Sequence, residues 1–368
     1  MDRAAVQCGA DAQIGGRLPP SRPSNVPPRS SRASGPLLLA LGVGLAAAAF
    51  VWFGAQRVTP NGDARSDFDH LWFAARVLWS GGDPYAAIGP HAGAAFRFQW
   101  PLYYPLTTVV AVLPLAALPL PVARALFVAA PAALLTWQLA RRSRWHPLGL
   151  LSYGVIDALG AAQWSVLTTA AALTPVAGGL LALKPQAALA WVLATLSPRL
   201  LRDVAIVGLA LLAVSLWLDP AWIGRWLHAV STATHVRPLI VRPLAWPLLL
   251  ALSRWRRLDA RVLLATALVP ITPAPYELVP LLLVPRSRVQ MLALVSCTWI
   301  AYAVQYQLVV HVAMARRVGV AQDALLALVL LPALVLVLRR PNVGAVPPWA
   351  ADAAHWLRTR GRLPTAAP

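Results

Sequence analysis

Apolar residues in this chain are gathered into long blocks that short polar segments separate. The first block covers residues 36–56, about the length that a helix needs to cross the hydrocarbon core of a bilayer. The later blocks cover residues 105–120, 121–140, 147–173, 176–196, 203–218, 243–253, 259–284, 288–310 and 320–338. This pattern predicts an all-α polytopic membrane protein, with a transmembrane domain over residues 35–340 and about nine to eleven spans.

Prolines interrupt many of these blocks, among them Pro114, Pro119, Pro121, Pro175, Pro185, Pro270, Pro273, Pro275 and Pro280. A broken helix persists in a membrane only where protein or water satisfies the freed backbone groups. We therefore expect kinked and broken helices rather than simple rods. If blocks 105–120 and 121–140 both crossed, the basic residues 141–144 would lie outside, against the positive-inside rule, so one of the two is a candidate re-entrant segment.

The polar segments suggest how the chain is oriented. Residues 1–34 are rich in Pro, Ser, Arg and Gly and are predicted to form a disordered basic cytoplasmic tail, and residues 341–368 a second cytoplasmic tail. Residues 57–104 form the predicted first extracytoplasmic loop. Within that loop Leu71, Ala75 and Leu78 recur at helical spacing, which predicts an amphipathic helix over residues 67–80 near the membrane surface.

Composition and charge agree with a membrane protein. Of the residues, 58% are hydrophobic and 12% are charged, and the mean hydropathy is +0.62. The net charge of +19 comes from 32 Lys and Arg against 13 Asp and Glu, and arginines gather at the ends of apolar blocks, in residues 141–144, 254–257, 286–288 and 339–340. Charges so placed are topology signals and argue against nucleic-acid binding. The two cysteines, Cys8 and Cys297, are too few for a disulfide framework or a metal cluster.

Few carboxylates are available for chemistry. Asp67, Asp69 and Asp83 fall in the first outward loop, whereas Asp157 and Glu277 lie within or beside apolar blocks. A carboxylate held at the membrane surface can act as a base on a hydroxyl group. Asp67 and Asp69 each have a plainer alternative, which is to cap the helix that they precede.

Lys184 lies inside an apolar block, where a cation is a candidate functional residue. Its alternatives are a side chain that snorkels to the interface or one that pairs with Asp157.

Several short motifs follow one another along the chain. They are Asp67-Phe68-Asp69-His70-Leu71-Trp72-Phe73-Ala74-Ala75, Trp100-Pro101-Leu102-Tyr103-Tyr104-Pro105, Ala162-Gln163-Trp164-Ser165, Leu183-Lys184-Pro185-Gln186, and Thr272-Pro273 followed by Tyr276-Glu277. This series resembles glycosyltransferase family 87 of the GT-C superfamily, which contains polyprenol-phosphate-mannose-dependent mannosyltransferases. The resemblance covers residues 36–340 and implies a GT-C-like bundle with a loop helix after the first span.

The resemblance also implies residue roles. The family's catalytic aspartate in the first extracytoplasmic loop matches Asp67, with Asp69 in reserve because its side chain points to another face of the helix. Lys184 would meet the leaving phosphate. Gln163 matches a Gly-Gln position in which Ala162 replaces the glycine. Further substrate-binding or phosphate-binding candidates are His235, Arg237, Arg242 and Glu277.

The function implied by the resemblance is that of an inverting GT-C hexosyltransferase. It would move a hexose, with mannose first, from a polyprenyl-phosphate-sugar donor to a glycolipid or glycan acceptor of the cell envelope. The site would face the extracytoplasmic side of the cytoplasmic (plasma) membrane and would need no metal and no cofactor. The competing hypotheses are a transporter or flippase, which predicts internal repeats and paired charges at mid-membrane, and a non-catalytic membrane scaffold.

Overall fold

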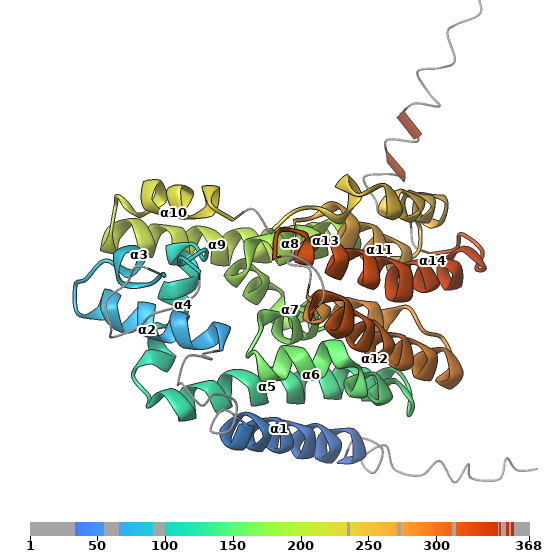
Figure 1. Ribbon diagram of the computed structural model, residues 1–368, viewed down its shortest axis with the longest axis horizontal. Coiled ribbons are helices and arrows are strands. Elements are labelled where there is room, and N and C mark those ends of the chain that lie inside the picture. Colours follow the sequence, from blue (N-terminus) through green and yellow to red (C-terminus); the bar gives the residue numbers. More distant parts are fainter. Residues whose placement is uncertain are drawn as a thin grey trace, which may run out of the picture. The chain divides into compact units, whose positions relative to one another are not determined.

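The computed structural model describes residues 34–54, 66–90, 100–233, 236–270, 274–310 and 314–344, with residues 346, 351–352 and 355–356. Within these ranges the regular elements are helices (Figure 1). The first half contains α1 (Ser34–Gly54), α2 (Asp67–Trp79), α3 (Pro84–Ala87), α4 (Leu106–Ala116), α5 (Leu120–Arg142), η2 (His146–Leu151), α6 (Tyr153–Gly160), α7 (Trp164–Ala172), η3 (Pro175–Leu183) and α8 (Pro185–Thr195). The second half contains α9 (Pro198–Leu218), α10 (Trp222–Ser231), η4 (Leu239–Val241), η5 (Pro243–Arg254), α11 (Leu258–Leu268), η6 (Pro275–Leu283), α12 (Arg288–Val310), α13 (Met314–Leu325), η7 (Leu326–Leu330) and α14 (Leu331–Leu338).

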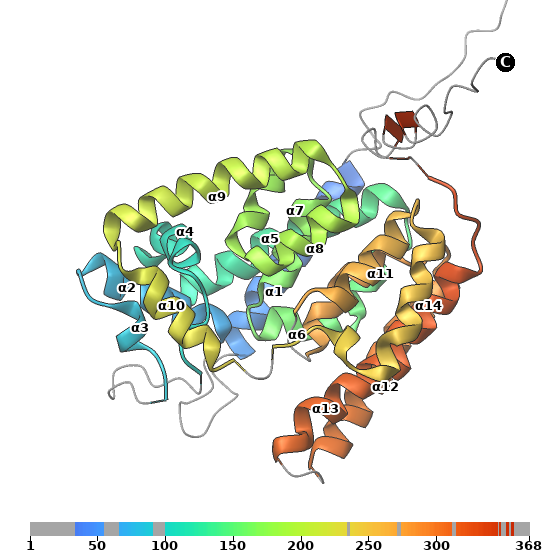
Figure 2. The same cartoon turned by 90° about the horizontal axis from the view of Figure 1, so that it is seen from above.

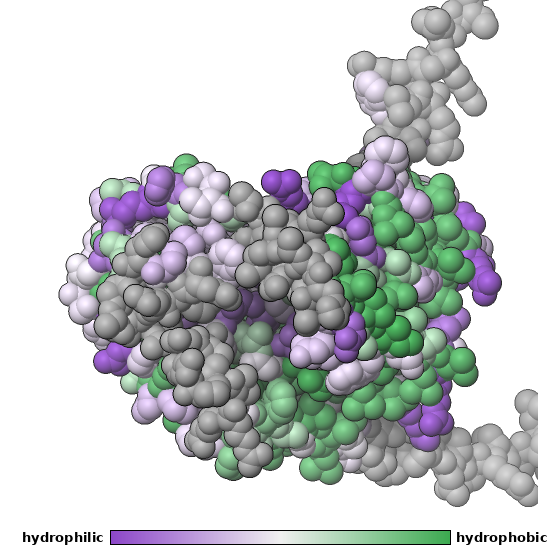
Figure 3. All heavy atoms as spheres, in the orientation of Figure 1, coloured by the Kyte–Doolittle hydropathy of each residue, from purple (hydrophilic) through white to green (hydrophobic). Residues whose placement is uncertain are grey.

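Five of the described helices are long and apolar enough to cross a membrane. They are residues 34–54, 120–142, 198–218, 288–308 and 319–338. In Figure 3 hydrophobic residues cover a broad area at the right and bottom of the view, whereas hydrophilic residues gather at its edges. The chain is therefore an all-α membrane protein, as predicted. The number of nine to eleven spans stays a prediction, because several apolar blocks are divided into helices shorter than a membrane is thick.

Prolines account for much of this division. The block 147–173 is split into η2, α6 and α7, and the block 176–196 into η3 and α8. Pro175, Pro185, Pro243 and Pro275 each open a helix, where the missing N–H costs little because it would have no partner within the helix. The expectation of broken helices is confirmed. Five of the short described elements, η2, η3, η4, η5 and η6, are 3₁₀-helices, which rise more steeply per residue than α-helices.

The blocks 105–120 and 121–140, one of which is expected to be re-entrant, differ in length. The first forms α4, with 11 residues, and the second forms α5, with 23 residues. At 1.5 Å per residue α4 is about 16 Å long, roughly half of the hydrocarbon thickness, whereas α5 reaches about 34 Å. By length, α4 is the re-entrant candidate of the pair.

The helix expected in the first outward loop is present as α2, one residue shorter than predicted. Its buried face carries Phe68, Leu71, Ala74 and Ala75 and packs against α4 and α5. Phe68 stacks on Phe127 of α5 with ring centroids 4.5 Å apart. The apolar face of α2 is therefore covered by protein. Helices α2, α3 and α4 lie together on the left of Figures 1 and 2, and α11, α12 and α14 lie together on the right.

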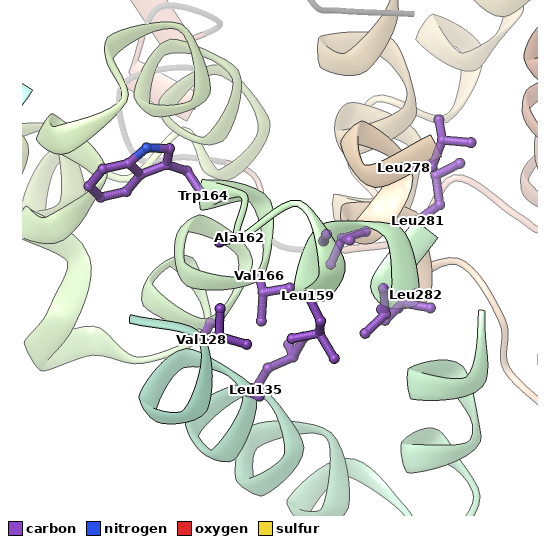
Figure 4. Close-up of a cluster of buried hydrophobic side chains, with 14 of the residues drawn as sticks. Val128, Leu135, Leu159, Ala162, Trp164, Val166, Leu278, Leu281 and Leu282 are labelled. Carbon is purple, nitrogen blue, oxygen red and sulfur yellow. The ribbon is translucent and has the colours of Figure 1, made fainter. Parts of the chain in front are cut away.

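Between these two groups lies a core built from α5, α6, α7 and η6 (Figure 4). The residues labelled in that view are Val128, Leu135, Leu159, Ala162, Trp164, Val166, Leu278, Leu281 and Leu282. The edge of the Trp164 ring meets the ring of Phe127, 4.9 Å away. This packing fixes the turn between α6 and α7 and the beginning of η6, and both regions carry residues of the candidate site.

Candidate functional site

Asp69 stabilises the beginning of α2. One of its carboxylate oxygens accepts a hydrogen bond from the Ser66 amide at 2.9 Å, and the other accepts one from the Ser66 hydroxyl at 2.7 Å. The guanidinium of Arg124 on α5 donates to both oxygens, at 2.8 and 2.6 Å. Asp69 is only 1% exposed. Its oxygens are thus occupied by a helix cap and a two-pronged ion pair, so the capping alternative holds for Asp69.

Asp67 points to a different partner. Its carboxylate accepts a hydrogen bond from the side-chain amide of Gln163, which precedes α7. Its backbone N–H donates to the carbonyl of Ala161 at 3.0 Å. Two hydrogen bonds therefore hold the first residue of α2 against the turn that joins α6 to α7.

That turn contains a strained residue. Ala162 has a φ of +48°, in the left-handed region that favours glycine. It is fully buried. The conformation lets the chain reverse within three residues, so that the Ala161 carbonyl and the Gln163 amide both face Asp67. The motif resemblance implies a glycine at this position, and glycine would adopt such a conformation without strain.

Lys184 lies inside the protein, 4% exposed, and its ammonium donates a hydrogen bond to Glu277 at 3.0 Å. It also lies over the ring of Tyr276, 5.9 Å from the centroid. The alternative in which Lys184 snorkels to the interface does not fit this burial. The alternative partner Asp157 instead accepts a hydrogen bond from the backbone N–H of Tyr276 at 3.3 Å.

Each side chain of this cluster stands at the beginning of a helix. Asp67 is the first residue of α2, Gln163 precedes α7, Lys184 precedes α8, and Glu277 lies in the first turn of η6. Helix beginnings carry unpaired N–H groups and a partial positive charge, which favour carboxylates and bound anions. We call Asp67, Gln163, Lys184 and Glu277 the helix-start cluster.

Burial raises the pKa of Asp67 to about 7, although the positive charge of Lys184 opposes the shift. Glu277, Asp157 and Asp69 add to it by repulsion. A carboxyl group that titrates near neutral pH can accept a proton from a hydroxyl and release it again. Asp69, in contrast, is paired with Arg124.

His70, on the next turn of α2, has a different role. Burial lowers the pKa of its imidazole to about 3, so the ring stays neutral at physiological pH. The ring packs on Tyr104 with centroids 5.5 Å apart. His70 is therefore a packing residue at the edge of the cluster. Among the described residues, no three His, Cys, Asp or Glu side chains are grouped as metal ligands.

A small cavity of about 40 Å³ lies beside the helix-start cluster. Its polar lining consists of Ser165, Thr168, Gln186, Thr266 and Glu277. At about 10–15 Å³ per water molecule, the cavity has room for a few waters. The Ser165 hydroxyl is buried and has no hydrogen-bond partner among the described residues, which is the kind of group that a water or a substrate hydroxyl satisfies.

The remaining candidate residues are not part of this cluster. Arg242 forms an ion pair with Asp323 of α13, with one N–O distance of 2.7 Å. Arg237 is exposed, and in the described ranges neither arginine contacts Asp67, Lys184 or Glu277. His235 lies outside the described residues, as does the Thr272-Pro273 pair.

Sequence reasoning did not identify Arg124 or the aromatic residues around the cluster. Arg124 is one of several arginines near block ends, and nothing local in the sequence marks it as the partner of Asp69, 55 residues away. Tyr104 and Trp164 belong to the motifs noted above, and their rings lie 6.4 Å apart. Their place in these motifs was the one feature of the sequence that could have indicated their position beside the cluster.

Comparison of the chain with known protein families, with curated proteins and with solved structures finds no match. The functional interpretation therefore depends on the site itself and on the motif resemblance.

Proposed function

We propose that this protein is a membrane glycosyltransferase that moves a hexose from a polyprenyl-phosphate-sugar donor to a hydroxyl of a glycolipid or glycan acceptor. The observation that carries the proposal is the setting of Asp67. Gln163 positions its carboxylate, burial raises its pKa to about 7, and the buried cation Lys184 is close enough to influence that pKa. A base and a cation held in one site are what displacement of a phosphate from a sugar requires.

The reaction follows from these groups. Asp67 takes the proton from the acceptor hydroxyl, and the acceptor oxygen attacks the anomeric carbon of the donor. The bond between that carbon and the phosphate oxygen breaks on the opposite face, so the configuration inverts. The electron pair leaves with polyprenyl phosphate, and the proton remains on Asp67 until solvent removes it.

Lys184 and the helix beginnings stabilise the negative charge on the leaving phosphate. In the unliganded protein Glu277 supplies the negative charge next to Lys184. A phosphate that enters would share Lys184 with Glu277, so donor binding would loosen this ion pair. Mannose is the sugar that the motif resemblance favours.

The lengths of the helices support a site recessed below the membrane surface. Helices α8 and α11 have 11 residues each and are about 16 Å long, half of the hydrocarbon thickness. Lys184 lies at the beginning of α8, and Glu277 follows the end of α11. Irregular backbone at this depth fits a water-filled cavity that a lipid-linked head group enters from the side.

The orientation of the chain follows from its basic ends. With α4 re-entrant, α1 leads outward and α5 returns, so that residues 141–144 are cytoplasmic. The other basic runs, residues 254–257, 286–288 and 339–340, belong on the same side. In this proposed orientation α2 and the helix-start cluster lie toward the extracytoplasmic side of the cytoplasmic membrane.

The proposal is tested by transfer of labelled mannose from polyprenyl-phosphate mannose in membranes that carry the protein. We expect Asp67→Asn to reduce transfer by at least about 100-fold, since a positioned general base contributes about that much. Asp83→Asn is the matched control. Asp83 lies in the same loop but caps α3 and pairs with Arg225, 3.2 Å away. Full activity of Asp67→Asn would remove Asp67 from its assigned role.

A transporter or flippase is the second candidate, and one observation favours it. Lys184 and Glu277 form a buried pair of opposite charges beside Asp67 and Asp157, and such groups also serve ion-coupled transport. Reconstituted vesicles separate the two functions. Movement of a labelled lipid-linked sugar across the bilayer, without any glycosylated product, would favour the transporter.

A further inference from the structure

A second charged cluster lies around Asp259, the second residue of α11, and is separate from the helix-start cluster. Its carboxylate is 1% exposed and forms ion pairs with three arginines. Arg340 lies 2.6 Å from it, Arg257 3.0 Å and Arg286 3.5 Å. Although burial raises the pKa of Asp259, its hydrogen bond from Arg257 and the positive charges of the three arginines hold that pKa below its usual value.

One carboxylate cannot neutralise this many arginines. Arg257 and Arg340 are 10% and 12% exposed and form close ion pairs with Asp259. Arg286 is 59% exposed, and its guanidinium makes only a longer contact with one Asp259 oxygen. Arg142, the exposed last residue of α5, lies on the same rim, and no carboxylate pairs with it in the described ranges. Four guanidinium groups and one carboxylate leave an excess of three positive charges.

Helix η2 follows α5 after three residues and packs against both α5 and α12, with Gly149 of η2 next to the side chain of Met291 in the first turn of α12. The end of α5, with Arg142, and the beginning of α12, which Arg286 precedes, are therefore neighbours through η2. The imidazole of His146 in η2 has its pKa lowered to about 4, first by burial and then by the charges of Arg142 and Arg286. Like charges repel at short range, so an anion between Arg142 and Arg286 would stabilise both. Their exposure leaves room for that anion to come from outside the protein.

The placement of these arginines indicates which anion it is. Arg142 ends the spanning helix α5, Arg286 stands two residues before the spanning helix α12, and Arg340 stands two residues after α14. The ends of spanning helices lie at the level of the lipid head groups. Basic pockets between such ends on the cytoplasmic side fit acidic phospholipid head groups.

We propose that Arg142 and Arg286, on the rim that Arg257, Arg340 and Asp259 hold in place, bind the phosphate of an acidic phospholipid in the cytoplasmic leaflet. The bound lipid would supply the missing negative charge and connect the ends of α5, α11, α12 and α14. Because this rim belongs to the opposite end of the spanning helices from the proposed active site, the proposal does not depend on the transferase function.

The test is a lipid titration of the purified full-length protein in detergent. Short-chain phosphatidylglycerol is compared with phosphatidylcholine of the same acyl chains and with inorganic phosphate. We expect tighter binding of phosphatidylglycerol than of either. The double variant R142Q/R286Q should weaken that binding about 30-fold, because each basic side chain near an anionic head group contributes about fivefold.

The matched control is R199Q/R202Q at the beginning of α9. These arginines are 66% and 65% exposed and lie next to Asp203. Their substitution removes the same charge from the same predicted membrane side. The control should bind phosphatidylglycerol like the wild type.

Equal affinity for phosphatidylcholine, or an equal loss in both double variants, would overturn the proposal. Inorganic phosphate that binds as tightly as the lipid would assign the site to a soluble anion instead. Circular dichroism confirms that each variant keeps its helices, and the single variants R142Q and R286Q provide the same test if the double variant unfolds.

Discussion

The side-chain amide of Gln163 donates a hydrogen bond to the carboxylate of Asp67, 96 residues earlier in the chain. This bond and the one from the Asp67 N–H to the Ala161 carbonyl join the beginning of α2 to the turn between α6 and α7. The relationship makes Gln163 a positioning residue for Asp67.

Removal of the Gln163 amide tests that role. We expect Gln163→Ala to reduce transfer by about tenfold or more, because a carboxylate without its orienting partner samples other positions. Gln163→Glu should be worse, since a second carboxyl group would face Asp67 and raise its pKa further. Transfer rates measured across pH separate the two effects. In Gln163→Ala the rate falls at every pH, whereas in Gln163→Glu the rise in rate also moves to higher pH.

The pKa of Asp67 predicts a pH dependence with a definite sign. A base must be deprotonated, so transfer should rise with pH through about 7 and then level off. The stability has the opposite dependence. Because the folded-state pKa of about 7 lies above the ordinary aspartate value of 3.8, the folded chain holds the proton more tightly and loses stability as pH rises between these values.

Asp67→Asn should remove this pH-dependent loss, because asparagine stays neutral and its oxygen still accepts from Gln163. Thermal unfolding in detergent at pH 5 and pH 8 measures the effect. We expect the variant to be at least as stable as the wild type at pH 8. A variant that unfolds at a much lower temperature at both pH values would mean that the carboxylate supports the fold.

The ion pair of Asp69 and Arg124 is predicted to be structural. Arg124→Ala would leave a 1% exposed carboxylate without its ion-pair partner, which costs about 3–5 kcal/mol. The double variant Asp69→Asn/Arg124→Ala should cost less than Asp69→Asn and Arg124→Ala together, because the double variant leaves no buried charge without a partner. Unfolding midpoints of the four proteins form a double-mutant cycle, and additive losses would show that the two residues do not interact.

Lys184 and Glu277 allow stability and chemistry to be separated. Lys184→Met should destabilise the protein by about 3–5 kcal/mol, because Glu277 loses its partner in a buried setting. The double variant Lys184→Met/Glu277→Gln removes both charges and should regain most of that stability. If Lys184 contacts the leaving phosphate, the double variant stays inactive in the mannose-transfer assay. Recovery of activity together with stability would limit Lys184 to a structural role.

Ala162 gives a test of the backbone in the α6–α7 turn. Ala162→Val should destabilise the protein by about 2–4 kcal/mol, because a β-branched side chain is strained at a φ of +48° and the site is fully buried. Ala162→Gly should be neutral or stabilising by up to about 1 kcal/mol, since glycine adopts this conformation without strain. Thermal unfolding of both variants checks the opposite signs.

Pro114 and Pro280, two of the prolines expected to interrupt apolar blocks, lie inside α4 and η6. The sequence alone determined that the chain is a helical membrane protein with broken helices, and that a helix begins at Asp67. These properties are local. Transfer of an apolar block into lipid depends on its own length and composition, and a proline ends a helix through its own ring and missing N–H.

Only the tertiary structure decided which acidic residue caps α2 and which faces the site. The hydrogen bond from Gln163 to Asp67 joins residues 96 positions apart in the chain. The ion pair of Arg124 with Asp69 joins residues 55 positions apart, and that of Lys184 with Glu277 joins residues 93 positions apart. Side-chain spacing within one helix cannot specify such pairs, because they depend on how separate helices pack. Packing likewise placed Arg242 beside Asp323 rather than in the cluster, and it raised the pKa of Asp67 by burying it.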